Sequence, residues 1–267
     1  MCSIEKLAKK ELNKHNYLIE NNETYTAIYF SSNGLFNDVE TFERNIVEKN
    51  KFEFYKTKID KATKHIYIRD INRKWYSNGI NKELDSVEKV VEFLKEETKG
   101  TKIITLGSSM GGYGAVLFGI LLNAEYIFNF SGKCVLDEYY NKYSSIVGLI
   151  KNSNIPIFYM VPSLSQRDVK QFCFVKDFNN VHVLLLKSAV HGVPVVGDTL
   201  KSIINSDLKT LNKMYSYKNR DITEVAFILK YFGIQRFFLR MIKKNTACTL
   251  NKYFIHDKNK KILALGI

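Results

Sequence analysis

Several features that define particular classes of protein are missing from this sequence of 267 residues. Residues 1–22 are polar and rich in Lys, Glu and Asn, without the basic start and apolar run of a secretory signal. No segment reaches the roughly 18 uninterrupted apolar residues of a membrane-spanning helix. We therefore expect a soluble chain that is not exported and that works in the cytoplasm.

Cysteine is also scarce, and its spacing excludes the usual sulfur-based sites. The four cysteines are scattered, with no C-x-x-C pair and no histidine spacing suited to zinc. Free thiols are therefore expected, rather than disulfides or a metal site. Internal repeats and low-complexity segments are absent as well. The cysteines are Cys2, Cys134, Cys173 and Cys248.

Positive charge is plentiful but unevenly distributed. The net charge is +13, and residues 207–267 hold 13 Lys or Arg against four Asp or Glu. Residues 1–206 are therefore close to balanced. This asymmetry predicts a catalytic domain over residues 1–206 and a basic, helical C-terminal extension over residues 207–267.

Short apolar runs recur along the first 206 residues in the pattern of strands buried on both faces. Helices, or room for them, separate most of these runs, which predicts an α/β fold with a mostly parallel, doubly wound sheet. A short strand at 17–19 is expected to pair antiparallel with 25–30, and residues 132–154 could form a cap over a site. The six strand candidates are 25–30, 65–69, 101–106, 126–130, 155–161 and 181–186.

The most informative motif follows the strand candidate at 101–106. Residues 107–111 read Gly-Ser-Ser-Met-Gly, which fits the G-x-S-x-G pattern of a nucleophile elbow. In that turn a serine stands between strand and helix, and small neighbours let the backbone bend sharply. An apolar, helix-like run follows the motif, as the pattern requires. Ser109 is therefore the candidate nucleophile.

Two further residues complete a catalytic triad in the predicted sheet. His191 follows the last strand candidate beside a glycine, and Asp168 follows the fifth. A serine needs a base to take its proton, and the imidazole needs a carboxylate to hold its tautomer. The chain order Ser, Asp, His is that of α/β-hydrolases. Asp168 could instead cap the helix that follows it, in which case Asp137 would be the acid.

The elbow also predicts where an oxyanion would be bound. One donor would be the backbone N–H of Met110, directly after the nucleophile, and the second would come from the loop after the first parallel strand. That loop contains Ser32, Asn33 and Gly34, of which we favour Asn33.

A polar loop at 70–79 holds the only tryptophan of the chain. Trp75 and Tyr76, with Arg73 beside them, could form a wall that stacks on a sugar ring, although such aromatic residues could also be packing residues. Ser108 of the elbow is a further candidate substrate contact. The strand-end arginines Arg69, Arg73 and Arg167 could meet phosphate groups, although the sequence holds no phosphate-binding signature.

The elbow sequence at 107–115, Gly-Ser-Ser-Met-Gly-Gly-Tyr-Gly-Ala, resembles that of α/β-hydrolase-fold proteins associated with bacterial surface polysaccharides. That group includes capsule O-acetyltransferases with a Ser-Asp-His triad and acetyl-CoA as co-substrate, and the three strand-end arginines could meet the phosphates of coenzyme A. The resemblance covers roughly residues 24–206, and the 70–79 loop shares it. It implies an acyl-Ser109 intermediate, with no bound cofactor, from which a sugar hydroxyl or water takes the acyl group. Transferase and hydrolase both remain open, and a non-catalytic scaffold of a glycan-assembly system is the alternative.

The basic extension contains one long amphipathic pattern, at 222–244. Five basic residues fall on one side of a helical wheel, which suits a helix packed on the domain with a solvated cationic face. The same face could lie on an anionic membrane or attract an anionic polysaccharide. No zinc, helix-turn-helix or RNP-like motif accompanies the charge, which argues against nucleic acid. The five residues are Lys230, Arg236, Arg240, Lys243 and Lys244.

Overall fold

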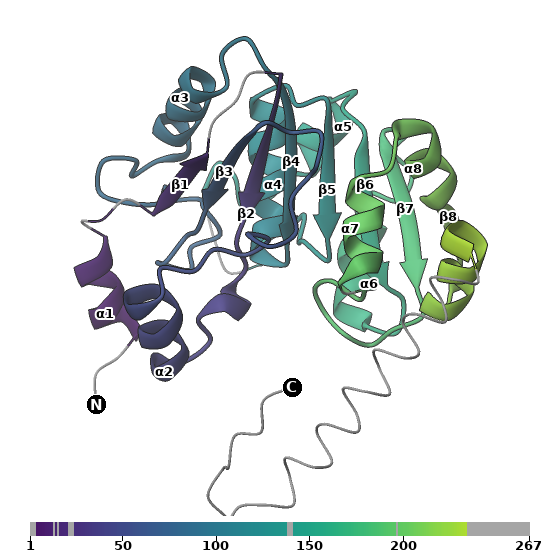
Figure 1. Ribbon diagram of the computed structural model, residues 1–267, viewed down its shortest axis with the longest axis horizontal. Helices are drawn as coiled ribbons and strands as arrows, with labels where there is room; N and C mark the ends of the chain where they lie inside the picture. Colours follow the sequence, from purple (N-terminus) through teal and green to yellow (C-terminus); the bar gives the residue numbers. More distant parts are fainter. Residues whose placement is uncertain are drawn as a thin grey trace, which may run out of the picture. The chain divides into compact units, whose positions relative to one another are not determined.

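The computed structural model describes residues 4–12, 14, 16–20, 24–137, 141–195 and 197–233, and within them a sheet of eight strands has the order β1-β3-β2-β4-β5-β6-β7-β8 (Figure 1). Only β1 runs antiparallel to its neighbour; the other pairs are parallel. The strands are β1 Tyr17–Glu20, β2 Tyr25–Phe30, β3 Lys64–Ile68, β4 Lys102–Ser108, β5 Tyr126–Phe130, β6 Ile157–Pro162, β7 Val181–Leu186 and β8 Ser216–Ile222.

The six strands expected from apolar runs are all present and form β2 to β7. Every residue of β5 and β6 is buried, because helices cover a parallel sheet on both faces. In the view of Figure 1, α4 (Met110–Leu121) passes behind the sheet and α7 (Asp198–Ile204) passes in front of it. The expected α/β fold with a mostly parallel, doubly wound sheet is confirmed.

The remaining helices and helical turns precede or connect the strands. Helix α3 begins at Val87, because the Ser86 side chain accepts a hydrogen bond from the Lys89 N–H and caps the helix there. These elements are α1 Ile4–Glu11, η1 Asn33–Leu35, α2 Val39–Phe42, η2 Glu43–Glu48, α3 Val87–Glu97, α5 Val147–Lys151, α6 Gln166–Cys173 and α8 Leu208–Met214.

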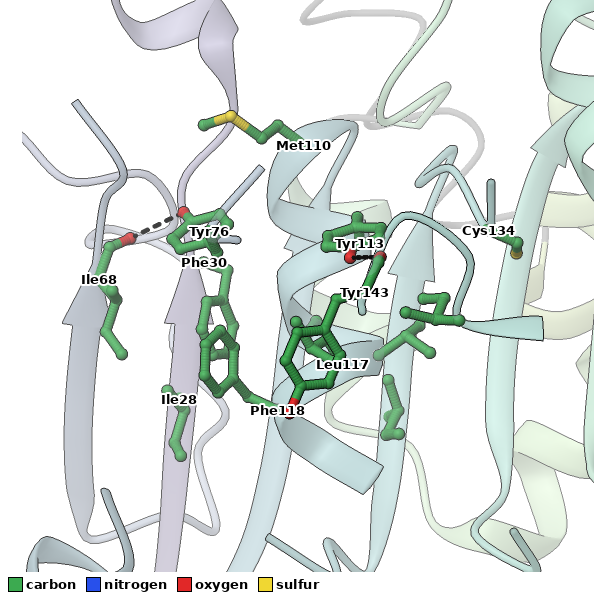
Figure 2. Packing of buried hydrophobic residues seen from close by; sticks show 14 of the residues in the cluster. Ile28, Phe30, Ile68, Tyr76, Met110, Tyr113, Leu117, Phe118, Cys134 and Tyr143 are labelled. Atoms are coloured by element: carbon green, nitrogen blue, oxygen red, sulfur yellow. Dashed lines mark hydrogen bonds between the residues drawn. The ribbon is translucent and has the colours of Figure 1, made fainter. Parts of the chain in front are cut away.

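The core between β2 and α4 is aromatic (Figure 2). The rings of Phe30 and Phe118 stack with their centroids 5.4 Å apart, and the ring of Tyr76 meets Phe30 edge-on at the same centroid distance. All three side chains are fully buried. Large apolar rings packed in this way fix α4, and the turn that begins it, against the centre of the sheet.

The edge strand does not pair as expected. β1 pairs antiparallel with β3, not with β2, so that Tyr17 lies opposite Ile68. Both edges of β2 are occupied by parallel neighbours, β3 on one side and β4 on the other. The outer edge of β3 is therefore the position left for β1.

The far edge of the sheet extends beyond the expected domain boundary at residue 206. β8 pairs with β7, although its sequence, Ser-Tyr-Lys-Asn-Arg-Asp-Ile, is polar. An edge strand can be polar because backbone hydrogen bonds to its neighbour hold it. The first compact unit consequently runs to Ile222 and includes α8 and β8.

The second unit begins at Thr223 and is described only as far as residue 233. A helix covers residues 224–233. Of the five basic residues expected on one helical face, Arg236, Arg240, Lys243 and Lys244 lie outside the described residues. In the expected cap at 132–154, the described residues include α5, and residues 138–140 are not described.

Candidate active site

Ser109 lies in a strained turn between β4 and α4. Its φ of 54° and ψ of −117° are unusual for a residue with a side chain, and such a conformation costs about 1–3 kcal/mol. The turn is fixed by a 2.8 Å hydrogen bond from the Ser109 N–H to the carbonyl of Phe130 on β5. A Cβ at Gly107 would lie 2.0 Å from the Gly111 oxygen, and a Cβ at Gly111 would lie 2.0 Å from the Phe30 oxygen, so both positions require glycine.

The side chains of three distant segments meet at this turn. His191 Nε2 lies 2.7 Å from Ser109 Oγ, and His191 Nδ1 lies 2.8 Å from Asp168 Oδ1. Ser109 follows β4, Asp168 follows β6 and His191 follows β7. Since the carboxyl ends of parallel strands meet at one edge of a sheet, the three loops converge there.

The acid in this cluster is Asp168. Its side chain is only 3% exposed, whereas that of His191 is 30% exposed. Asp168 lies in the first turn of α6 but does not cap it, because Ser165 occupies the N-cap position. Asp137, the alternative acid, is exposed and makes no contact with His191 in the part of the chain that the structure describes.

The loop that carries His191 is held by a residue that sequence reasoning missed. Ser131 Oγ donates a 2.7 Å hydrogen bond to the carbonyl oxygen of Gly192, and Gly192 has a φ of 98°. Ser131 itself is buried and has a φ of 55°. The sequence feature that could have pointed to Ser131 is its position directly after the strand predicted at 126–130, at the edge of the sheet where the site lies.

The two backbone N–H groups expected to bind an oxyanion each begin a helical element. The Met110 N–H is the first of α4, and the Asn33 N–H is the first of η1; neither donates a hydrogen bond within the described residues. The backbones of the two segments are close, because a Cβ at Gly111 would lie 2.0 Å from the oxygen of Phe30. Unpaired donors at helix starts attract negative charge.

The loop that contains Asn33 is tied to Glu53, a second residue missed from the sequence. The Glu53 carboxylate accepts hydrogen bonds from the Ser32 N–H at 2.8 Å and from Ser32 Oγ at 2.6 Å. Burial raises the pKa of Glu53 above its ordinary value. No pattern in the sequence marks Glu53, since it lies in an irregular segment between η2 and β3.

A cavity of about 1070 Å³ opens beside Ser109 and His191. Of the expected substrate contacts, Trp75, Arg73 and Ser108 line it, and so does Asn33. Five cations and three carboxylates contribute to its lining, which favours an anionic ligand group. The cations are Lys9, Arg73, Lys74, Lys133 and Arg167, and the carboxylates are Glu5, Glu53 and Asp137.

Tyr76, expected beside Trp75 in the wall, belongs to the core instead. It is fully buried, and its hydroxyl donates a 2.7 Å hydrogen bond to the Ser31 carbonyl. The loop turns around the buried Asp70, whose carboxylate accepts from three backbone N–H groups, including that of Tyr76. Trp75 therefore lines the cavity, while Tyr76 beside it packs in the core.

Arg69 is also not a cavity residue. It is buried, and its guanidinium donates to the Lys51 carbonyl and to the Asn50 side chain, both at 2.8 Å. Burial lowers the pKa of Arg69 to about 10. Of the three arginines considered for coenzyme A phosphates, Arg73 and Arg167 line the cavity.

The described residues contain neither a metal-binding cluster nor a membrane-spanning helix. Within residues 4–233, apart from the gaps given above, no group of three or more His, Cys, Asp or Glu side chains is placed to hold a metal ion. Over the same residues, no helix combines the length and apolar character needed to cross a membrane.

The sequence matches no protein-family model and no curated protein. Several solved structures are similar to this chain at low identity. A mutant capsule O-acetyltransferase of Neisseria meningitidis serogroup A with CoA is 13% identical, covering 75% of this chain and 93% of that chain, with a TM-score of 0.45. MenH from S. aureus is 12% identical, covering 82% and 99%, with a TM-score of 0.42. At these identities and TM-scores the similarity assigns no function to this chain, so we infer its function from the geometry of its own site.

Proposed function

We propose that this chain catalyses acyl-ester chemistry through an acyl-Ser109 intermediate, either as an O-acetyltransferase or as an esterase of a bacterial surface polysaccharide. The observation that carries the proposal is the continuous chain of hydrogen bonds from Ser109 through His191 to Asp168, built on a strained elbow. A purely structural turn has no need of an imidazole held between a hydroxyl and a buried carboxylate.

In the first half-reaction, Ser109 Oγ attacks the acyl carbonyl carbon while its proton passes to His191 Nε2. The carbonyl oxygen becomes an oxyanion, which the Met110 and Asn33 N–H groups stabilise. Asp168 stabilises the imidazolium through Nδ1. The intermediate then collapses, and the leaving group departs with the proton from His191 Nε2, which leaves an ester on Ser109.

In the second half-reaction, a hydroxyl group replaces the leaving group. His191 Nε2 takes the proton of a sugar hydroxyl or of water as its oxygen attacks the acyl-serine carbon. Collapse of this second intermediate returns the proton to Ser109 Oγ and releases a sugar ester or a free acid. Transfer and hydrolysis thus share the same residues and differ in the acceptor.

The cavity supports an acyl donor with negative charge, such as acetyl-CoA. Arg73, Lys74, Lys133 and Arg167 can meet phosphate groups at its wall, and Trp75 offers an aromatic surface to a sugar ring. Lys133 Nζ lies 5.2 Å from the centre of the Trp75 ring, so charge and aromatic surface are adjacent. The acetyl group and the polysaccharide themselves come from the resemblance of the elbow sequence.

We place the enzyme in the cytoplasm, with its basic C-terminal segment on an anionic surface. Residues 223–267 hold nine Lys or Arg against two Asp or Glu. Such a segment is drawn to anionic lipids or to an anionic polysaccharide. Either contact would keep the enzyme near a growing surface polymer.

Intact-mass spectrometry tests this function and separates its two forms. The protein is incubated with acetyl-CoA and, separately, with 4-nitrophenyl acetate. An acetyl adduct from acetyl-CoA that Ser109→Ala lacks indicates a transferase, whereas rapid ester turnover without such an adduct indicates an esterase. No adduct and no Ser109-dependent turnover with either donor would contradict both.

A further inference from the structure

The loop that carries the second oxyanion donor is held by one carboxylate. Oε2 of Glu53 accepts from the Ser32 N–H at 2.8 Å, and Oε1 accepts from Ser32 Oγ at 2.6 Å. Ser32 Oγ in turn accepts from the Gly34 N–H at 3.0 Å. The residue between them, Asn33, is thus held on both sides while its own N–H takes no part.

These hydrogen bonds have a fixed direction. The Gly34 N–H can only donate, so the Ser32 hydroxyl accepts from it and uses its own hydrogen for Glu53. Glu53 must accept from two donors at once, which a carboxylate does with its two oxygens. An amide could accept only one of them in the same position, because its nitrogen is a donor.

A backbone hydrogen bond and a turn hold the segment around Glu53 against the loop that contains Asn33. The Glu53 N–H donates to Ser31 Oγ at 3.2 Å, and the next residue, Phe54, has a φ of 62°. Glu53 forms no ion pair with a Lys or Arg in the described part of the chain. Burying a carboxylate without a cation beside it costs free energy, because the charge loses contact with water. The hydrogen bonds from the Ser32 N–H and hydroxyl offset this cost and stabilise the Glu53 carboxylate.

We propose that Glu53 is a positioning residue for the oxyanion site, which fixes Ser32 and Gly34 so that the Asn33 N–H is directed at the developing oxyanion. This rests on the proposed function, in which the Asn33 N–H stabilises the tetrahedral intermediate. Within the described residues Glu53 forms no hydrogen bond with Ser109, and its side chain acts through Ser32. Its effect belongs to the transition state and not to binding of the intact ester.

The test measures kcat and KM for 4-nitrophenyl acetate in the full-length chain. Removing one oxyanion donor typically lowers kcat by about 100-fold to 1000-fold. We expect Glu53→Ala to lower kcat by about 100-fold with KM unchanged, and Glu53→Gln, which keeps one acceptor, by about 10-fold. Ser32→Ala, which removes the hydroxyl link but keeps the Ser32 N–H, should resemble Glu53→Gln. Glu48→Gln, an exposed acid outside the cavity, is the matched control.

A second readout separates positioning from loss of folded protein. Phenylboronic acid forms a tetrahedral adduct with an active serine and places an oxygen in the oxyanion site. Its inhibition constant does not depend on how much of the sample is folded. We expect that constant to rise in the Glu53 variants by the same factor as kcat falls, and to stay at the wild-type value in Glu48→Gln.

The outcomes are distinct. If kcat falls while the inhibition constant for phenylboronic acid stays unchanged, Glu53 only supports folding and the proposal is wrong. If Glu53→Ala keeps the wild-type kcat, the proposal is wrong while the acyl-serine function stands. If Ser109→Ala turns over the ester as fast as the wild type, the proposed function and this inference both fall.

Discussion

His191 Nδ1 lies 2.8 Å from Asp168 Oδ1, and this contact joins the loop after β7 to the first turn of α6. The carboxylate is buried and the imidazole is partly exposed, so one side of the ring is held while the other faces Ser109. The pair fixes which nitrogen of His191 carries the proton at rest. In the proposed mechanism that nitrogen is Nδ1, which leaves Nε2 free to accept.

Asp168→Asn tests this orientation. The amide nitrogen can donate to Nδ1 and favour the wrong tautomer, so we expect kcat for an aryl acetate to fall by about 10⁴-fold. Steady-state kinetics measure the effect, and Asp137→Asn provides the comparison. A large loss in Asp137→Asn with none in Asp168→Asn would transfer the role to Asp137.

Ser131→Ala tests the support of the His191 loop. The buried Gly192 carbonyl would lose its donor, which costs about 1–3 kcal/mol of unfolding free energy. The kcat should fall as well, because His191 loses its fixed position. Urea unfolding and kinetics measure both effects. Ser153→Ala removes a serine bond far from the site and should leave kcat unchanged; equal kcat values in the two variants would exclude this role of Ser131.

Asp70→Asn tests the carboxylate at the centre of the 70–76 turn. Burial raises the pKa of Asp70 from 3.8 to about 6, so the folded chain binds the proton more tightly than the unfolded chain does. Its contribution to stability is therefore fully present below about pH 4 and is lost as the pH rises through about 6. From about pH 4 to above pH 6, the unfolding free energy of the wild type should fall by about 3 kcal/mol relative to that of Asp70→Asn.

Urea unfolding of both proteins at a series of pH values measures this difference. The unfolding free energy of the wild type, minus that of the variant, should decrease steadily as the pH increases. A difference that stays constant over the whole series, or that increases with pH, would show that Asp70 has no raised pKa in the folded chain.

Removal of residues 223–267 tests the proposed role of the basic segment. The cut follows β8, so the sheet is left complete. We expect binding to vesicles of anionic lipid to be lost, and binding of the full chain to weaken strongly between low and high salt. Co-sedimentation measures both. Vesicle binding that is unaffected by the cut or by salt would rule out an electrostatic contact through this segment.

The sequence predicted the parallel sheet and the positions of Ser109, His191 and Asp168 because each depends on a local pattern. Apolar runs define β2 to β7, and small residues define the elbow. It did not predict β8, whose polar residues carry no strand pattern, nor the partner of β1, which depends on β2 having two neighbours.

Residues whose roles depend on contacts between distant parts of the chain also could not be predicted from the sequence. Glu53 lies 21 positions from Ser32, and Ser131 lies 61 positions from Gly192. Only the folded chain brings these pairs together. The prediction that Tyr76 lies in the cavity wall was wrong for a different reason. Its neighbour Trp75 lines the cavity, and a loop sequence does not show which of two adjacent rings turns into the core.

The most direct test of the central claim is labelling of the folded protein with a fluorophosphonate, followed by peptide mapping. The account predicts one phosphonyl adduct on Ser109, which Ser109→Ala lacks and which Asp168→Asn forms much more slowly. Circular dichroism shows that each protein is folded during the reaction. A folded wild-type protein that leaves Ser109 unlabelled would contradict the acyl-serine mechanism.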